Sequence, residues 1–229
     1  MFKPLALAAA LLAATPAFAD LSIRYMNSDA SAPQLTTSMT TSYTTSSLSF
    51  VTSTGDSFLA YCIEPRQNFA LSVKSDGVTP NFKTYTVGAF TSTQSSLLQA
   101  LYSSSFSSSL SGTEQAGFQL AVWEIMRETS SSTLSVSQDS GSFFLRTAGL
   151  AGAALTDATN AQNYATNYLA AAQSYTGASL YTLMKLENAV YQDLVVATAV
   201  NAVPEPETYA MLLAGLGIVG LVARRRLPR

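Results

Sequence analysis

The sequence contains no histidine and a single cysteine, and only 11% of its residues are charged. Without histidine, the Ser/His/Asp and Cys/His arrangements of nucleophilic catalysis cannot form, and neither can metal sites that use imidazole. The glycines are scattered and build no phosphate-binding loop, and the carboxylates show no calcium-loop spacing and no pairing that favours a glycosidase. We therefore expect no catalytic residue, no cofactor and no metal site, and we do not expect an enzyme.

The N-terminus has the layout of a secretory signal peptide. Lys3 supplies a positive charge, "LALAAALLAA" is an apolar run too short to cross a bilayer, and "AFA" precedes Asp20 as a cleavage site. An uncleaved anchor helix is the alternative, which the short apolar run and Pro16 disfavour. The sequence predicts a signal peptide over residues 1–19 and an exported body.

The C-terminus combines a stiff polar motif, a short apolar segment and a cluster of arginines. "VPEPE" at 203–207 is followed by apolar residues at about 208–223. The arginines after this segment are Arg224, Arg225, Arg226 and Arg229. Arginines in this position hold the end of the chain on the cytoplasmic side, and the segment is short for a permanent span. We expect a temporary membrane tether with the body outside the inner membrane.

This layout resembles the PEP-CTERM sorting signal, with Pro204, Glu205 and Pro206 as the motif. In that family of Gram-negative exported proteins, an exosortase processes the signal at Pro-Glu-Pro. The resemblance covers residues 203–229. It implies retention by a short transmembrane helix and the arginines, then delivery to the cell surface or extracellular matrix. An ordinary tail anchor is the alternative, and it leaves Pro-Glu-Pro unexplained.

The remaining body, residues 20–202, is long enough for one domain with a hydrophobic core. The whole chain has a net charge of −2, but the body has seven basic and twelve acidic residues and a net charge of −5. No basic patch is present, so nucleic acid is not an expected partner.

The body is predicted to contain strands, then helices, then strands. Alternating and apolar runs predict strands within 36–54, 57–64, 82–90, 179–187 and 191–198. Helical spacing predicts helices at about 91–105, 112–128 and 156–174. Ser111 and Glu114 form a capping box at the start of the second helix. The pattern predicts an α+β fold, a single exported domain of barrel-like or sandwich-like strands with a small helical part.

The second predicted helix carries a glutamine in an apolar setting. "FQLAVWEIM" at 118–126 is apolar nearly all round, so Gln119 must find partners or cost about 1–3 kcal/mol. In one interpretation, Gln119 hydrogen-bonds the backbone of a neighbouring strand. In the other, its amide carbon is bonded to Cys62, a cysteine without a disulfide partner in an exported protein.

Two short motifs resemble the signatures of bacterial Cys–Gln thioester domains, the TQXA-type adhesin modules. They are Tyr61-Cys62-Ile63 and the Gln119-to-Trp123 spacing. In that family, a cysteine sulfur is joined to a glutamine side chain on a later helix with loss of ammonia. The resemblance implies a thioester between Cys62 and Gln119. An inert buried pair and an unrelated fold are left open.

The match to this family has one departure, and a second glutamine is an alternative to Gln119. The family has threonine before the glutamine, where this chain has Phe118. Gln115 lies one helical turn before Gln119, but it lacks the spacing to Trp123.

A thioester must be shielded from water. Tyr61, Phe118 and Trp123 are expected to form an apolar wall, although Trp123 also suits the core. Glu64 is a possible proton acceptor for an attacking amine, and an ion pair with Arg66 or plain solvation is the alternative.

The sequence leaves two functions open. In the first, a lysine amine or sugar hydroxyl on a partner attacks the acyl carbon of Gln119 and releases Cys62, giving a permanent adhesive link. In the second, the protein is a non-reactive structural component of the extracellular matrix, associated with exopolysaccharide or biofilm. The expected partners are an exosortase, the inner membrane for a time, and an unidentified surface or matrix molecule bearing an amine or hydroxyl.

Overall fold

The structure, a computed structural model, describes residues 20–128 and 134–200. The predicted signal peptide and the sorting signal, with its apolar segment and arginines, lie outside the described residues. Within the described ranges, no helix combines the length and the hydropathy needed to span a membrane. The chain divides into two units, Met1–Thr198 and Ala199–Arg229, and the described strands and helices lie in the first, apart from Ala199 at the end of the last strand.

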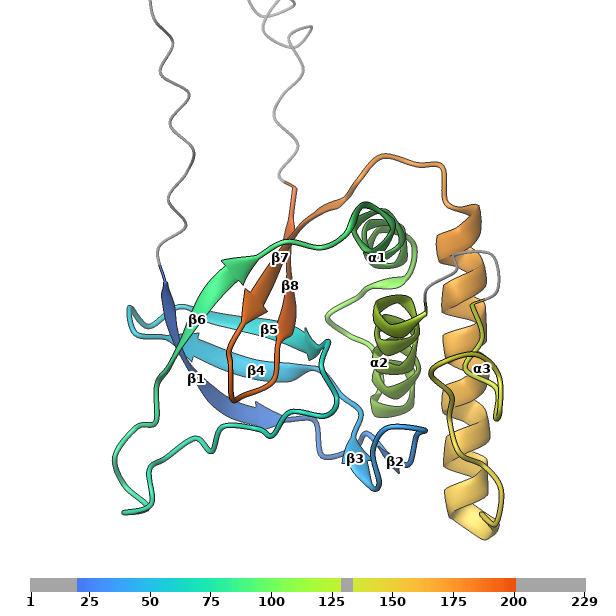
Figure 1. The fold of residues 1–229 in the computed structure, drawn as a ribbon, viewed down its shortest axis with the longest axis horizontal. Helices are drawn as coiled ribbons and strands as arrows, with labels where there is room; N and C mark the ends of the chain where they lie inside the picture. The colour runs from blue at the N-terminus through green and yellow to red at the C-terminus, as the bar shows by residue number, and fades with distance from the viewer. Residues whose placement is uncertain (1–19, 129–133, 201–229) are drawn as a thin grey trace, which may run out of the picture. The chain divides into compact units, whose positions relative to one another are not determined.

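Six strands close into a barrel in the order β1–β4–β5–β8–β7–β6 (Figure 1). They are β1 (Leu21–Ser28), β4 (Leu48–Thr52), β5 (Ser57–Cys62), β6 (Lys83–Gly88), β7 (Tyr181–Glu187) and β8 (Leu194–Ala199). β1 pairs with β4 and β6, β4 with β5, β5 with β8, and β6 with β7, all antiparallel. A separate small sheet joins β2 (Gln34–Leu35) and β3 (Tyr43–Thr44). The strand that carries Cys62 is therefore held between β4 and β8.

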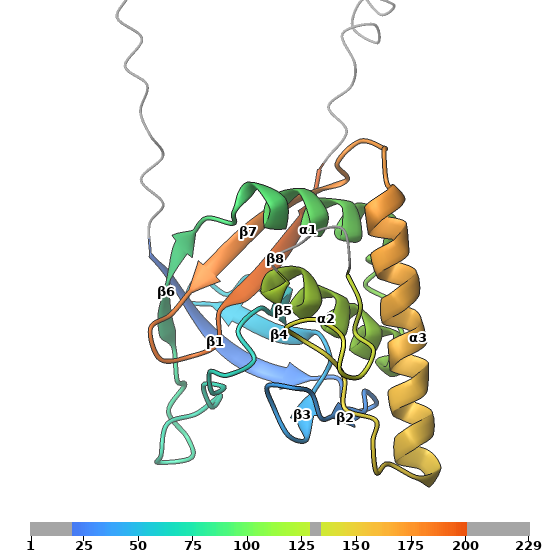
Figure 2. The same ribbon diagram turned by 45° about the vertical axis from the view of Figure 1, so that its right-hand side comes forward.

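Three helices pack beside this barrel in two layers. α1 (Ser92–Ser105) contacts β7 and α2 (Gly112–Arg127) contacts β5, while α3 (Gly152–Ser174) covers both helices on the side away from the strands (Figures 1 and 2). Because α2 lies between the barrel and α3, every residue from Gln115 to Ile125 is buried. This agrees with the prediction that most of 118–126 is buried; Met126 is half-buried.

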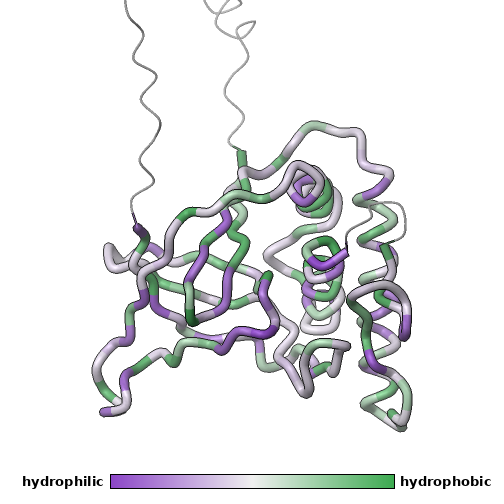
Figure 3. Tube along the Cα trace, viewed as in Figure 1, coloured by the Kyte–Doolittle hydropathy of each residue, from purple (hydrophilic) through white to green (hydrophobic). Residues whose placement is uncertain are grey.

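Small residues let α2 and α3 approach closely. A Cβ atom on Gly117 would collide with Tyr164 and with the backbone at Ala161. The buried stripe of α3 consists mostly of alanines, namely Ala158, Ala161, Ala165 and Ala172, with Leu169 among them. Hydrophobic stretches recur along both α1 and α2 (Figure 3). The alanine-rich composition of α3 thus reflects helix packing against this pair.

The helix starts follow from local capping. Ser111 N–H donates to Glu114 Oε2 at 2.7 Å, which confirms the predicted capping box. α1 has a second capping box that the sequence analysis did not predict: Thr91 N–H donates to Gln94 Oε1 at 3.1 Å, and Gln94 N–H to Thr91 Oγ1 at 3.2 Å. Each box satisfies backbone donors that the first turn leaves without partners.

Three elements differ from the prediction, and one of them is β2, which lies just before the predicted strand range 36–54. α3 begins already at Gly152 rather than near 156, because residues 153–155 continue the helix on an exposed face that shows no apolar periodicity. β1 was not predicted. Its side chains are mostly half-buried, with Ile23 the single fully buried one, so the strand gives a weak alternation signal.

Candidate functional site

The side-chain amide of Gln119 meets the main chain of Cys62. Cys62 N–H donates to Gln119 Oε1 at 3.0 Å, and Gln119 Nε2 donates to the Cys62 carbonyl at 2.7 Å. Both residues are only 1% exposed. The hydrogen bonding to a neighbouring strand that the sequence allowed is therefore observed, and the strand residue involved is the one that carries the thiol.

The barrel leaves a gap at Cys62 that Gln119 fills. β4 begins opposite Ala60, so beyond that point β5 has no β4 residue beside it. On the other side, Ile63 N–H donates to the Asp193 carbonyl at 2.9 Å. Since successive residues of a strand direct their hydrogen-bonding groups to opposite sides, those of Cys62 point to the side where β4 has ended. The Gln119 carboxamide takes the place of a strand peptide there.

The thiol of Cys62 lies in a dry environment with two nearby donors. Burial raises the pKa of Cys62 to about 12, and the side chains of Trp123 and Tyr43 and the backbone at Glu64 act in the opposite direction. Neither the indole N–H of Trp123 nor the hydroxyl of Tyr43 makes a well-formed hydrogen bond within the described residues. Both groups are thus available to the sulfur, but burial prevails and a free thiol stays protonated at neutral pH.

Trp123 and Tyr43 hold each other in place above the thiol. Their rings meet edge to face with centroids 5.6 Å apart. Trp123 also packs on Phe143 at 5.9 Å, and Tyr43 stacks on Phe69 at 5.4 Å. Such pairs fix ring orientation as well as burying area. The predicted double role of Trp123, core residue and site wall, fits this placement.

One face of α2 supplies three contacts to the end of β5. Gln119, Trp123 and Arg127 follow one another at four-residue spacing, so they share that face. Arg127 forms an ion pair with Glu64. The alternative considered from sequence was an ion pair between Glu64 and Arg66, and the structure gives Arg127 as the partner instead. The ion pair thereby fixes the carboxylate of Glu64, which lies two residues after Cys62.

Gln115, the rival glutamine, is engaged elsewhere. Its Oε1 accepts hydrogen bonds from Ser47 N–H at 3.1 Å and Ser47 Oγ at 2.9 Å, and its Nε2 donates to Asp29 Oδ2 at 2.8 Å. It ties the segment before β4 to α2. The structure therefore brings Gln119, and not Gln115, to Cys62.

The other two predicted wall residues belong to a separate aromatic cluster. The rings of Tyr61 and Phe118 lie 4.8 Å apart, and both contact Phe106. Neighbouring residues of a strand point to opposite faces, so Tyr61 is directed away from the face of β5 that carries the thiol. Tyr61 and Phe118 close the interface between β5 and the helices, while Trp123 is the wall residue at the sulfur.

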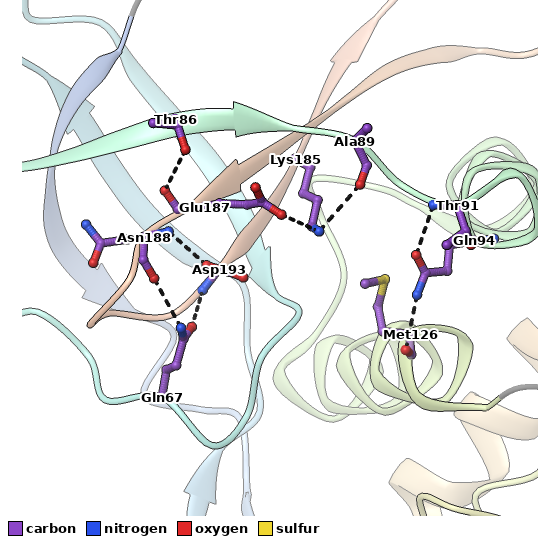
Figure 4. A network of polar contacts seen from close by, with 10 residues as sticks. All are labelled: Gln67, Thr86, Ala89, Thr91, Gln94, Met126, Lys185, Glu187, Asn188 and Asp193. Atoms are coloured by element: carbon purple, nitrogen blue, oxygen red, sulfur yellow. Dashed lines mark hydrogen bonds and ion pairs between the residues drawn. The ribbon is translucent and has the colours of Figure 1, made fainter.

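The chain after Cys62 is anchored to the β7–β8 connection. Asp193 N–H donates to Gln67 Oε1 at 2.9 Å, Gln67 Nε2 donates to the Asn188 carbonyl at 3.1 Å, and Asn188 N–H donates to Asp193 Oδ1 at 2.9 Å (Figure 4). Together with the hydrogen bond from Ile63 N–H to the Asp193 carbonyl, this closed network fixes the segment that follows Cys62.

Two residues of this site were not predicted from the sequence. Tyr43 lies in the Ser/Thr-rich stretch 36–54, in the two-residue strand β3. No local pattern in the sequence marks it. Arg127 could have been found, because it continues the four-residue spacing of Gln119 and Trp123.

Comparisons with known proteins add a sorting motif and a likeness of fold. No curated protein sequence matches the chain. The N-terminal domain of the Streptococcus pyogenes pilus tip adhesin Cpa is 14% identical, with a TM-score of 0.44 over 79% of this chain and 94% of that one. The N-terminal thioester domain of fibronectin-binding protein SfbI from Streptococcus pyogenes is 13% identical, with a TM-score of 0.43 over the same shares. A family model described as the PEP-CTERM protein-sorting motif matches residues 202–226, so the chain carries that motif at its C-terminus.

Proposed function

We propose that the protein is an exported surface protein that forms a thioester between Cys62 and Gln119 and uses it once to attach covalently to a partner. The observation that supports this most strongly is the pair of hydrogen bonds that holds the Gln119 carboxamide against Cys62 in a buried site. The sorting motif at 202–226 supports export to the surface.

Bond formation would exchange one bond at the amide carbon for another. The sulfur of Cys62 attacks Cδ of Gln119, the Cδ–Nε2 bond breaks, and the thiol proton leaves with that nitrogen as ammonia. The Cys62 N–H on Oε1 stabilises the charge that develops on this oxygen. The hydrogen bond to the Cys62 carbonyl orients the leaving nitrogen. Holding the groups together in this way can supply about 7–11 kcal/mol of the barrier.

Attachment would consume the thioester. An amine or hydroxyl of the partner bonds to Cδ of Gln119, the Cδ–Sγ bond breaks, and the proton of the nucleophile passes to sulfur. Glu64, held by Arg127, is proposed to accept that proton from an incoming amine and to pass it on to the departing sulfur. Because burial raises the pKa of Cys62 to about 12, the sulfur is released as a thiol, and the donors of Tyr43 and Trp123 stabilise it during release. The product is an isopeptide or ester link, without turnover.

A second candidate is a non-reactive structural protein of the extracellular matrix. One observation favours it: the hydrogen bonds between Gln119 and Cys62 satisfy the carboxamide and the strand end without any covalent bond. The two candidates differ in the mass and the thiol content of the mature protein.

Intact-mass measurement tests the proposal. The mature protein should be lighter than its calculated mass by one ammonia, and Cys62→Ala and Gln119→Ala should each remove the deficit. Gln115→Ala is the matched control and should keep it. In parallel, unfolded protein should resist thiol alkylation until methylamine opens the thioester. A protein of full calculated mass whose Cys62 is alkylated at once on unfolding would establish the structural candidate instead.

A further inference from the structure

A pocket of about 590 Å³ opens beside the end of β5. Its walls are the loop 37–41, Pro65, Arg66 and Arg146. Pro65 is the third residue after Cys62, so at most about 10 Å of chain separates their Cα atoms. The loop 37–41 leads directly into β3, which carries Tyr43. The pocket thus borders both chain segments that supply the thiol environment.

Two guanidinium groups line this pocket, and neither has a carboxylate partner among the described residues. Arg146 Nε donates to the Thr37 carbonyl at 3.0 Å, which fixes the side chain and leaves its terminal nitrogens for a ligand. The side chain of Arg66 has no hydrogen bond or ion pair within residues 20–128 and 134–200. Both arginines are exposed. In a body with an excess of acidic residues, this pocket gathers uncompensated positive charge.

Four of the five backbone donors of the loop are already used. Thr37 N–H donates to the Thr40 carbonyl and Ser38 N–H to the Phe144 carbonyl, both at 2.8 Å. Met39 N–H and Thr40 N–H both donate to Thr37 Oγ1 at 3.1 Å. An extended peptide that adds to a sheet needs free backbone groups of this kind. Recognition at this pocket therefore depends on side chains, namely on their hydroxyl and guanidinium groups.

We propose that the pocket binds the carboxylate-bearing sugar units of an acidic polysaccharide. Arg66 and Arg146 offer planar, paired N–H donors, the geometry that carboxylates accept in bidentate fashion. The hydroxyls of Ser38 and Thr41 can donate and accept, as sugar hydroxyls require.

This proposal names the partner class of the Cys62–Gln119 site and depends on the proposed function for the covalent bond, but docking does not need the bond. Two wall residues of the pocket, Pro65 and Arg66, directly follow Glu64 in the chain, so docked sugar hydroxyls would lie close to the proposed proton acceptor. The docking step can therefore be tested on a chain that cannot form a thioester.

The test is a calorimetric titration of the full chain carrying Cys62→Ala with oligogalacturonate, a chain of uronic acid units. Binding is expected, and it should weaken as salt rises above about 0.15 M because exposed charges are screened. The further change Arg66→Gln/Arg146→Gln should weaken it about tenfold or more, since each lost charge-assisted hydrogen bond weakens binding severalfold. A neutral maltooligosaccharide of equal length should not bind.

Lys74→Gln/Lys83→Gln is the matched control, because it changes the net charge equally at lysines outside the pocket. It should leave oligogalacturonate binding within about twofold of the Cys62→Ala chain. Arg66→Gln alone, which breaks no internal contact, should weaken binding about threefold even if the double variant fails to fold.

Equal binding by the double arginine variant and the lysine control would overturn the proposal. So would arginine-dependent binding of poly-glutamate with none of oligogalacturonate, because this would assign the pocket to acidic peptides. A mature protein without the ammonia deficit would refute the thioester but leave this titration unaffected, so the two failures are distinguishable.

Discussion

Two faces of α2 meet β5, and they differ in kind. On the polar face, Gln119 and Trp123 direct N–H groups toward Cys62. On the aromatic face, Phe118 packs ring to ring on Tyr61 with no polar contact between them. Phe118 and Gln119, adjacent residues of α2, thus have separate roles. The aromatic face holds the helix on the strand, and the polar face determines which group the helix presents to the thiol.

The aromatic face should contribute most to stability. Phe118→Ala should lower the free energy of unfolding by about 3–5 kcal/mol, because it removes a fully buried ring that contacts Tyr61, Tyr102 and Phe106 and leaves a cavity. Urea denaturation followed by fluorescence measures the loss. Phe118→Leu is the control and should lose less than about 2 kcal/mol. A similar loss in both variants would mean that the site cannot be refilled by an aliphatic side chain.

The polar face should come next, and it separates the two glutamines. In the Cys62→Ala background, Gln119→Ala should cost about 2–4 kcal/mol, because the N–H and carbonyl at position 62 both lose their partner in a dry site. Gln115→Ala should cost about 1 kcal/mol, because its partners Ser47 and Asp29 lie where water can replace the amide.

Equal costs at positions 115 and 119 would show that the contact with position 62 is no more buried than the contact with Ser47. Thermal unfolding of the two variants side by side makes that comparison without reference to any covalent bond.

Local signals in the sequence were sufficient for parts of both faces. The capping box at Ser111 set the start of α2, and the apolar run around Gln119 indicated a buried amide in need of partners. The apolar strand ending at Cys62 was equally visible. The family resemblance was needed to connect Gln119 with Cys62, because nothing in the periodicity of either segment says that α2 lies on β5.

Contacts that depend on long-range register were not predictable. Tyr43 reaches the thiol because β2 and β3 form a small sheet beside the barrel, in a stretch whose Ser/Thr bias carries no clear period. Arg66 and Arg146 line one pocket because Thr37 pairs with Leu145 across more than a hundred residues. Single-sequence patterns contain no information about such pairings.

A third effect concerns Glu124, which lies seven residues after Gly117, on the face of α2 turned toward α3, and is fully buried. Burial raises the pKa of its carboxyl to about 7, opposed by the Ser135 N–H that donates to Oε1 at 2.7 Å. Since the folded pKa exceeds the ordinary 4.5, Glu124 favours the folded state most below pH 4.5, and that contribution is lost as pH rises through 7.

Glu124→Gln should therefore stabilise the protein by about 2 kcal/mol at pH 8 and leave stability at pH 4.5 nearly unchanged. Urea titrations across this range measure the difference between variant and wild type as a function of pH. A constant difference at all pH values would place the effect in packing rather than in ionisation.

The smallest expected effect is at Tyr43, where a hydroxyl without a well-formed hydrogen bond faces the sulfur. Tyr43→Phe should leave the free energy of unfolding within about 0.5 kcal/mol, because no satisfied hydrogen bond is removed. The release of the Cys62 thiol by methylamine should nevertheless slow about tenfold, because the departing sulfur loses a donor in a dry site where Trp123 alone remains. Tyr25→Phe, at a ring that packs on Phe50 and Phe69, is the matched control and should not change the rate. If Tyr43→Phe reacts as fast as wild type, burial and Trp123 alone govern the sulfur, and Tyr43 belongs with the packing residues of the aromatic face.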